Sequence, residues 1–344
     1  MARFLLRRLI TSVVVLAGLA VVTFLMTQVL PGDPARAAAG RNATAEQVAQ
    51  VRARLGLDQP LWDQFLGYLG RLAHGDLGTS VFTQRPVLDD VAAMLPASVE
   101  LVLAAMVINV VVAVPLGAFA AYRRGRAADT AARIVALLGM AVPVFWLGLM
   151  LQLVLAAQLR VFPLTGQLSF GHQVPRITGM TTLDGLLAGD WAALADALAH
   201  LALPAVTLAA AFVAVVARTV RSSMITTLDS DYIALARATG AGEFRVVVRH
   251  GLRNALVPAS TILGMQLGWM LGSTVLVESI FGRTGIGAYA VTAVLQNDLY
   301  AVIGTVLVIG VVFVVMNVIV DLVQLWLNPR LRHTGRRRAT PVAA

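Results

Sequence analysis

Six long apolar stretches dominate this sequence and restrict what it can fold into. None of them contains arginine, aspartate or glutamate, and they lie near residues 9–30, 101–121, 134–159, 197–217, 255–277 and 299–320. About 20 helical residues cross a hydrocarbon core roughly 30 Å thick. Only 13% of the residues are charged, whereas a soluble domain usually has about 25%. The sequence therefore predicts an all-α membrane protein with six transmembrane helices.

The first apolar stretch follows MARFLLRR, which has the charge of a signal-peptide start, and ARAAAG beyond it resembles a cleavage site. The stretch is longer than the roughly 7–15 apolar residues of a secretory signal. Arg7 and Arg8 would also fit a twin-arginine signal, but five further apolar stretches favour ordinary membrane insertion. We therefore expect an uncleaved first helix.

Arginine alone decides the expected orientation, because the chain has no lysine. With the N-terminus inside, most arginines fall in cytoplasmic segments, and most of the others lie in one long outer loop, where the positive-inside rule has little force. We expect a multi-pass protein of the bacterial cytoplasmic membrane with both termini in the cytoplasm. Cytoplasmic loops that face anionic lipid headgroups then explain the net charge of +9, so membrane lipid is a partner and no nucleic acid is needed.

Missing residue types exclude several kinds of site. A P-loop needs a lysine that reaches the β- and γ-phosphates, so this chain cannot carry that ATPase motif. Without cysteine it has no disulfide, thiolate metal site or cysteine nucleophile. Its five histidines lack metal-ligand spacing, and no G-x-S-x-G motif occurs. We expect no metal site, no cofactor bound by this chain and no catalytic residues.

The first outer loop, residues 31–98, is long enough to fold. Thr44 and Gln47 have the spacing of a capping box, in which the two side chains satisfy free backbone amides at a helix start. A second short helix is expected from Pro60 to about Leu72, with apolar residues at helical spacing. The loop is either a small cap on the transmembrane helices or a docking surface for another protein, and its composition does not separate the two.

Polar residues near the ends of the apolar stretches are few, and they include Glu100, Glu278, Asn317 and Asp321. Asn317 and Asp321 are four residues apart and share one helix face, which predicts a structural hydrogen bond to a neighbouring helix. A carboxylate at membrane depth is unfavourable and usually faces a cavity or a partner. Glu278 is therefore a candidate for the lining of a path, with a structural salt bridge as the alternative.

The polar segment DYIALARATGAGEFRVVVRHGLRNALVP, residues 231–258, separates the fourth and fifth apolar stretches. Asp229 and Asp231 lie where a helix would begin, which suits the helix dipole. Ala234, Leu235 and Ala238 give that helix one small apolar face, and later glycines allow the chain to turn back. Such a helix is either a rigid lever that contacts a partner or an ordinary interfacial helix.

Short motifs are distributed over the whole chain. They are Arg8-Leu9, Leu30-Pro-Gly-Asp-Pro34, Leu55-Gly-Leu-Asp-Gln-Pro60, His74-Gly-Asp-Leu-Gly-Thr-Ser80, Ala236-Arg-Ala-Thr-Gly240, Arg249-His-Gly-Leu-Arg-Asn254, Glu278-Ser-Ile-Phe281 and Asn328-Pro-Arg330. In this order and between these apolar stretches, they resemble the inner-membrane permease subunits of dipeptide and oligopeptide ABC importers, specifically the first of the two permease types in such systems.

In that family, the cytoplasmic loop before the penultimate helix carries the EAA motif, and its short helix docks on an ATPase subunit. Aligned on Gly240, this chain agrees at only one of the three E-A-A positions, Ala236, and Pro258 lies farther from the glycine than in the general motif. The resemblance implies docking and coupling residues at Asp231, Tyr232, Ala234, Leu235, Ala236, Arg237, Ala238, Gly240 and Gly242. It also points to Glu278 and Phe281 as substrate-path candidates.

The resemblance implies the type I ABC importer permease fold and a division of the chain into four parts. These are an N-terminal cytoplasmic segment with the first helix (1–30), the outer loop with short helices (31–98), a core of five transmembrane helices (99–327) that includes a cytoplasmic coupling loop (218–254), and a basic cytoplasmic tail (328–344). The chain would pair with a second, related permease. Two ATPase subunits would bind ATP and Mg²⁺ inside, and a substrate-binding protein would deliver a peptide from outside.

The substrate stays open at this point, because importers of nickel chelates, glutathione and other small solutes share this permease family. The main alternative from another class is an ion-coupled secondary transporter, which would place acidic residues near the membrane midplane. In this sequence the acids lie near the ends of the apolar stretches. A non-transporting membrane assembly protein is a further alternative, and it would leave the 231–258 segment without an ATPase partner.

Overall fold

The computed structural model describes residues 2–29, 34–40, 43–54 and 56–327. Within these ranges the regular structure is helical, apart from one isolated bridge between Thr79 and Pro86. Five helices are long and apolar enough to cross a membrane, and a bent pair of helices raises the number of spans to six if it counts as one. The described part of the chain therefore agrees with the predicted all-α membrane protein.

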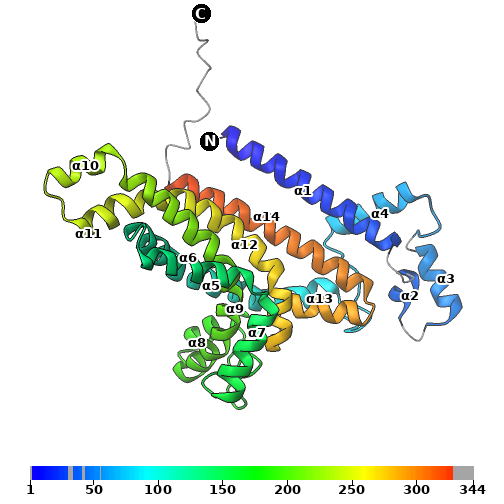
Figure 1. Cartoon of the computed structure of the whole chain (residues 1–344). Coiled ribbons are helices and arrows are strands. Elements are labelled where there is room, and N and C mark those ends of the chain that lie inside the picture. The colour runs from blue at the N-terminus through cyan, green and yellow to red at the C-terminus, as the bar shows by residue number, and fades with distance from the viewer. Residues whose placement is uncertain (1, 30–33, 41–42, 55, 328–344) are drawn as a thin grey trace, which may run out of the picture.

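The five long helices are α1 (Ala2–Val29), α5 (Val87–Tyr122), α9 (Trp191–Leu228), α12 (Arg253–Phe281) and α14 (Leu299–Leu327). The central pair is α5 and α9, which contact each other more extensively than any other two elements. Helix α12 packs on α9 and α14, and α1 lies at the outside against α14 (Figure 1). The order of the spans in space thus places the N-terminal helix at the periphery.

The third predicted span, residues 134–159, is not one straight helix. It consists of α6 (Ala127–Ala141), α7 (Val144–Leu151) and the π-helix η1 (Gln152–Gln158), with a bend of 99° between α6 and the rest. Pro143 lacks an amide hydrogen, and proline disfavours helical backbone in the residue before it. Val142 accordingly has extended backbone angles, φ −81° and ψ 127°, so the helix ends there and restarts after Pro143.

Short helices cover the end of the bundle opposite to α10 (Asp231–Ala238) and α11 (Glu243–Arg245) (Figure 1). Three of them, α2 (Pro34–Ala39), α3 (Ala45–Arg54) and α4 (Leu61–Ala73), come from the first outer loop. The predicted capping box is confirmed, because the Thr44 amide donates to Gln47 Oε1 at 2.9 Å and the Gln47 amide donates to Thr44 Oγ1 at 3.3 Å. The second predicted helix is also present, as α4.

Helix α4 is fixed to α1 by an aromatic contact and a hydrogen bond. The rings of Phe24 and Phe65 lie 5.2 Å apart edge to face, and the hydroxyls of Thr23 and Tyr68 are 2.8 Å apart. Tyr68 is buried, whereas Trp62 and Leu66 on the other face of α4 are exposed. The first outer loop therefore packs on the transmembrane helices and still presents an apolar outer surface.

Two further short helices are α8 (Thr181–Ala188), before α9, and α13 (Ile286–Leu295), between α12 and α14. Helix α13 packs on α12, α14 and α5. Helix α8 is followed by Gly189 at φ +71°, and Asp190 caps α9 by accepting a hydrogen bond from the Ala193 amide. These turns set the start of the long central helix.

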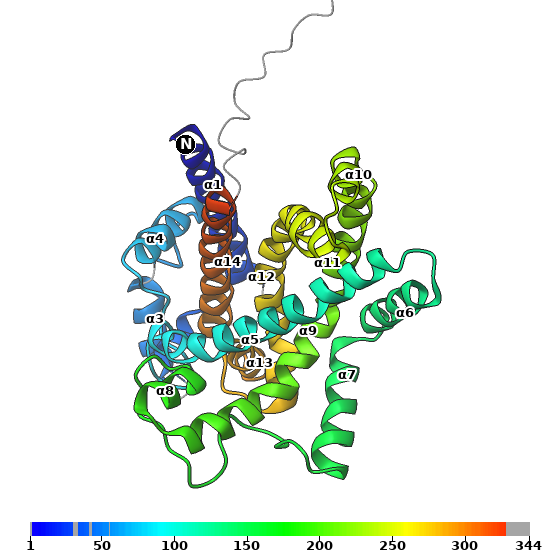
Figure 2. The same cartoon turned by 90° about the vertical axis from the view of Figure 1, so that its left-hand side faces the viewer.

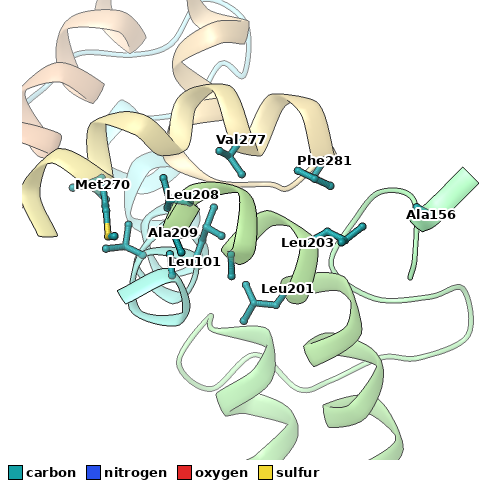
Figure 3. Packing of buried hydrophobic residues seen from close by; sticks show 13 residues of the cluster. Leu101, Ala156, Leu201, Leu203, Leu208, Ala209, Met270, Val277 and Phe281 are labelled. Carbon is teal, nitrogen blue, oxygen red and sulfur yellow. The ribbon is translucent and has the colours of Figure 1, made fainter. Parts of the chain in front are cut away.

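The interior is built where α5, α9 and α12 meet. One cluster combines Leu101 of α5, Leu208 of α9 and Met270, Val277 and Phe281 of α12 (Figure 3). A second cluster of small and branched residues lies nearer to α10 and is formed by the same three helices with the segment that follows α10. Small residues let membrane helices approach closely.

Gly117 of α5 gives the closest of these approaches between α5 and α9. A Cβ atom at this position would lie 2.5 Å from the carbonyl oxygen of Ala217, which is closer than a van der Waals contact. The outward faces of the same helices carry exposed apolar residues, among them Val107, Val111 and Trp269. Apolar side chains on both faces are typical of helices that are surrounded by lipid or by another membrane subunit.

Ion pairs show which helix ends lie at the same end of the bundle. Arg8 of α1 pairs with Asp321 of α14 at 2.6 Å, and Arg124 after α5 pairs with Asp229 after α9 at 2.8 Å. The contacts of Tyr68 with α1 lie at the opposite end. The helices therefore alternate in direction, as the sequence predicts.

Candidate functional site

The segment after α9 projects from one end of the bundle. It contains α10 (Asp231–Ala238), α11 (Glu243–Arg245) and the π-helix η2 (Val246–Leu252), which continues into α12. Figure 1 shows α10 and α11 beyond the ends of α12 and α14. The predicted coupling loop 218–254 includes the end of α9, which continues to Leu228, and the first residues of α12, which begins at Arg253.

A tight turn joins α10 to α11. The Gly240 amide donates to the Arg237 carbonyl and the Ala241 amide to the Ala236 carbonyl, both at 3.0 Å. Gly240 has φ +87°, which other residues rarely adopt because their Cβ atom clashes with the backbone. Gly242 has φ −62° and does not need to be glycine. The reversal of the chain therefore depends on Gly240.

An ion pair closes the same turn. Arg237 donates to both oxygens of Glu243, at 3.2 Å from Nε and 2.8 Å from Nη2. This hydrogen bond raises the pKa of Arg237 above its ordinary value, although partial burial acts in the opposite direction. Both side chains are about two-fifths exposed, so water screens the pair and its contribution to stability is small. Its role is to fix the direction of α11 relative to α10.

Three further contacts hold the projection to the membrane helices. Ile233, the central residue of α10, is completely buried. The Asn254 side-chain amide of α12 donates to the Tyr232 hydroxyl at 2.8 Å, and Asp229 pairs with Arg124 after α5. Displacement of α10 would therefore be transmitted to α12 and to the α5–α6 turn.

The outer surface of the projection is apolar for a segment outside the spans. Tyr232, Leu235 and Phe244 are 47%, 65% and 81% exposed. Asp231, Ala234, Ala238 and the two glycines are also exposed, and Ala236 is half-buried. Contiguous exposed apolar residues mark interaction sites. Eight of the nine residues that the sequence singled out are thus exposed on the projection. Together with Phe244 we call them the α10 surface.

Glu278 and Phe281, the path candidates, both lie inside the subunit. The Glu278 carboxylate accepts hydrogen bonds from Ser98 Oγ at 2.5 Å and from the amides of Gly287 and Ala288 at 2.8 and 3.0 Å. Phe281 belongs to the central apolar cluster. Glu278 is 1% exposed, so in this conformation it caps the N-terminus of α13 instead of facing an open path.

A second carboxylate lies close to this cap. Glu100 of α5 pairs with Arg283 at 2.9 Å and accepts hydrogen bonds from the amide and hydroxyl of Thr182 at 2.6 and 2.7 Å. Sequence reasoning noted Glu100 but found no partner, and it missed Ser98. The partners of Glu100 and Glu278 include residues about 80 to 185 positions away in the chain, so no local pattern could have identified them.

Asn317 and Asp321 have different partners. Asp321 forms the ion pair with Arg8 that joins α14 to α1. Asn317 instead donates to the Phe313 carbonyl of its own helix at 2.8 Å, so the predicted interhelical hydrogen bond is wrong for Asn317. Short polar side chains in a helix commonly bond to the carbonyl four residues earlier. Among the described residues, no group of histidine, aspartate and glutamate could hold a metal ion.

Sequence comparison agrees with this architecture. Residues 113–333 match the family described as "Binding-protein-dependent transport system inner membrane component", and residues 1–102 match its N-terminal companion. The chain belongs to this family. It has the type I ABC importer permease fold and is a membrane permease component of an ABC transporter, in keeping with the several apolar spans of a multi-pass inner-membrane protein.

Relatives of this permease cover nearly its whole length. It is 42% identical to the "Probable D,D-dipeptide transport system permease protein DdpB" of Escherichia coli K12 over 94% of this chain and 95% of the relative. It is 37% identical to the dipeptide transport system permease protein DppB of the same strain, over 97% and 99%. The glutathione transport system permease protein GsiC of Escherichia coli O6:H1 is 34% identical over 97% and 100%.

Proposed function

We propose that this permease is one of two related membrane subunits of an ATP-driven importer of short peptides, and that ATPase subunits dock on its α10 surface. The exposed apolar residues Tyr232, Leu235 and Phe244 carry the proposal. Tyr232 and Leu235 lie outside the candidate membrane spans, and Phe244 lies at the start of the helical run Glu243–Phe281 that contains α12. The projection that carries them is joined to α12 and to the α5–α6 turn. A docked subunit that moved α10 would therefore move the membrane helices.

The composition of the proposed complex rests on the family to which the chain belongs. In keeping with it, the chain has no lysine and so no P-loop for ATP, and ATP and Mg²⁺ would bind to two partner ATPase subunits. If ATPases dock at α10, then α10, the start of α1 and the end of α14 would lie on the cytoplasmic side. A substrate-binding protein would deliver the peptide to the opposite end, where α2, α3 and α4 lie (Figure 1).

The substrate class rests on the relatives. The two relatives at 42% and 37% identity carry names of dipeptide permeases, which favours a short peptide. A glutathione permease matches over the same length at lower identity, so glutathione is the nearest competing substrate, and nickel chelates are another. Because Glu278 and Phe281 are buried within the subunit, we expect the peptide path to lie between this subunit and the second permease.

An ion-coupled transporter fits the structure less well. Such a mechanism needs a carboxylate that titrates in a cavity near the midplane. The acidic side chains near the ends of the spans instead have partners. Glu100 pairs with Arg283, Asp129 with Arg221 and Asp321 with Arg8, and Glu278 accepts hydrogen bonds from Ser98 and from two amides of α13. These pairs lie towards the ends of the helices and hold neighbouring elements together.

Docking on the α10 surface is tested by Leu235→Glu. The tagged permease is purified in mild detergent and the ATPase that accompanies it is quantified. Burial of one leucine in an interface stabilises it by about 1.5–3 kcal/mol, so the variant should retain at most about one-tenth of the ATPase. Leu61→Glu is the matched control, because Leu61 is similarly exposed but lies on α4 at the other end.

Full ATPase retention in Leu235→Glu and also in Phe244→Glu would contradict docking at this surface. Substrate class is tested separately by uptake in a strain that lacks its own peptide permeases. We expect uptake of a labelled dipeptide that excess unlabelled dipeptide suppresses and excess glutathione does not. Competition by glutathione alone would replace the peptide proposal with its alternative.

A further inference from the structure

A hollow of about 420 Å³ lies between α5, α6 and α9. It is at the α10 end of the bundle, beside the turn of residues 123–126 that joins α5 to α6. Figure 2 shows these three helices next to that turn. The hollow has no part in the docking surface or in the Glu278 cap.

The wall of the hollow combines two kinds of side chain. Most of it is apolar and small, with several alanines, Gly117 and two leucines. The remainder is three arginines, Arg133 of α6 and Arg218 and Arg221 of α9. An apolar groove with a basic rim at the membrane surface matches a molecule that has a hydrocarbon chain and an anionic head.

The basic rim is only partly neutralised. Arg221 donates to both oxygens of Asp129 at 2.7 Å, and Arg133 lies 3.5 Å from the same carboxylate. Arg218 has no hydrogen-bond or ion-pair partner in the part of the chain that the structure describes, and it is exposed. Three cations and one anion therefore leave two positive charges facing the hollow.

The backbone keeps the hollow open instead of letting the helices close over it. Gly117 of α5 is already in contact with the Ala217 carbonyl of α9, so these two helices cannot approach further. The bidentate pair of Asp129 with Arg221 holds the start of α6 at a fixed distance from α9. Leu137, at the edge of the hollow, is about half exposed, which leaves an apolar opening towards the surroundings.

We propose that this hollow binds one anionic phospholipid, with its phosphodiester between Arg218 and Arg133 and an acyl chain against the alanines of α5, α6 and α9. Basic pockets between membrane helices at the cytoplasmic surface commonly hold anionic headgroups. The two unneutralised charges select an anionic lipid over a zwitterionic one. The bound lipid would fasten α6 to the central pair of helices at the end where ATPases are proposed to dock.

The test is native mass spectrometry of the full-length permease with the subunits that accompany it. Phosphatidylglycerol, phosphatidylcholine and the soluble headgroup glycerophosphoglycerol are titrated separately. We expect bound phosphatidylglycerol and little of the other two. A basic residue near an anionic surface contributes about 1 kcal/mol, so Arg218→Gln should weaken phosphatidylglycerol binding about five-fold. Arg126→Gln removes an exposed charge from the neighbouring turn, outside the hollow, and should leave the binding unchanged.

A second pair of variants tests the apolar wall. Ala136 lines the hollow, whereas Ala131 is exposed on the same helix and does not line it. Ala136→Phe should abolish the bound lipid, and Ala131→Phe should retain it. Because Arg218 has no partner among the described residues, Arg218→Gln should keep the folded complex intact, which separates loss of lipid from loss of fold.

Three results would overturn the proposal. If Arg126→Gln and Arg218→Gln weakened phosphatidylglycerol binding equally, the lipid would be attracted by the overall positive charge of this surface and not by a specific site. Equal binding of glycerophosphoglycerol would mean a phosphate site that does not use the apolar wall. The third result combines two observations: Ala136→Phe releases the second permease, and the wild type binds phosphatidylglycerol no more tightly than phosphatidylcholine. Together they would mean that the hollow is part of the subunit interface. None of these results affects the proposed peptide import, which is tested separately by the uptake of labelled dipeptide.

Discussion

Single carboxylates at the end of the bundle opposite to α10 decide how short helices are attached to long ones. Glu278 accepts two amides of α13 and the hydroxyl of Ser98, and Glu100 joins Arg283 to the start of α8. A buried carboxylate is tolerated only when its hydrogen-bonding capacity is filled. Each of these residues therefore acts on the structure through a specific set of partners.

Glu278→Gln should destabilise the permease. In glutamine, an NH₂ group that donates hydrogen bonds replaces one of the two accepting oxygens of glutamate. Either Ser98 or the α13 amides therefore lose an acceptor. Loss of a hydrogen bond to a charged group costs about 1.5–3 kcal/mol in the free energy of unfolding. Thermal unfolding in detergent measures the effect, with Glu243→Gln as a control because that side chain is exposed. Equal melting temperatures for Glu278→Gln and the wild type would contradict the cap.

Asp184 of α8 gives a pH-dependent prediction. Burial raises the pKa of its carboxyl group, but hydrogen bonds from the Thr178 hydroxyl and from the amides of Thr178 and Gly179 lower it overall. A lowered pKa stabilises the fold above the pKa of the unfolded chain, and this stabilisation is lost as the pH falls through the folded-state value. Asp184→Asn should therefore lower the melting temperature at pH 7. The difference from the wild type should shrink below about pH 4.

At the scale of elements, the conformation of one residue controls the α10–α11 turn. Gly240 and Gly242 have no neighbouring atoms within 4 Å of an added Cβ, so a methyl group at either position meets no steric obstacle. They differ in φ, which is +87° at Gly240 and −62° at Gly242. Backbone strain alone distinguishes the two sites.

Gly240→Ala should loosen the turn, whereas Gly242→Ala should not. The positive φ costs an L-residue about 1–2 kcal/mol. This cost corresponds to an increase of about five-fold or more in the open population of the turn. Tryptic cleavage after Arg237 and Arg245, followed by mass spectrometry, reports this opening. Equal cleavage rates in the two variants would show that the turn does not depend on Gly240.

The helices themselves could largely be predicted from local sequence. Apolar length located the spans, and the capping pair Thr44 and Gln47 located the start of α3. Proline was less informative, because Pro115 and Pro204 lie inside continuous helices whereas Pro143 ends one. Whether a proline is accommodated depends on what packs around the freed carbonyls. The same dependence on packing explains why the Ser98–Glu278 contact and the hollow beside Arg218 could not be predicted.

At the scale of the whole molecule, the ends of the helices sort into two groups. The ion pairs Arg8–Asp321 and Arg124–Asp229 lie at one end, and α13 is fixed to α5 at the other through the Ser98 hydroxyl. This alternation is compatible with only two orientations in the membrane. The proposed docking of ATPases on α10 selects one of them.

Introduced cysteines can determine the orientation directly, because the chain has none of its own. Phe170 is fully exposed in the loop between η1 and α8, and Arg126 is exposed in the α5–α6 turn, so each can be replaced by a cysteine that reagents can reach. A maleimide that does not cross membranes should label Phe170→Cys on spheroplasts and should label Arg126→Cys only after permeabilisation. The reverse pattern would place α10 outside the cell and rule out ATPase docking there.

The contact of α1 with α14 sets an order of events during synthesis. Helix α1 leaves the ribosome first, and Asp321, the partner of Arg8, is made roughly 300 residues later. At about 5–20 residues per second, synthesis of these residues takes roughly 15–60 s. During that interval α1 resides in lipid without its main packing partner. Many valines and leucines of α1 are exposed on the surface of the subunit and can contact lipid. Helix α1 can therefore stay inserted until α14 is made and packs against it.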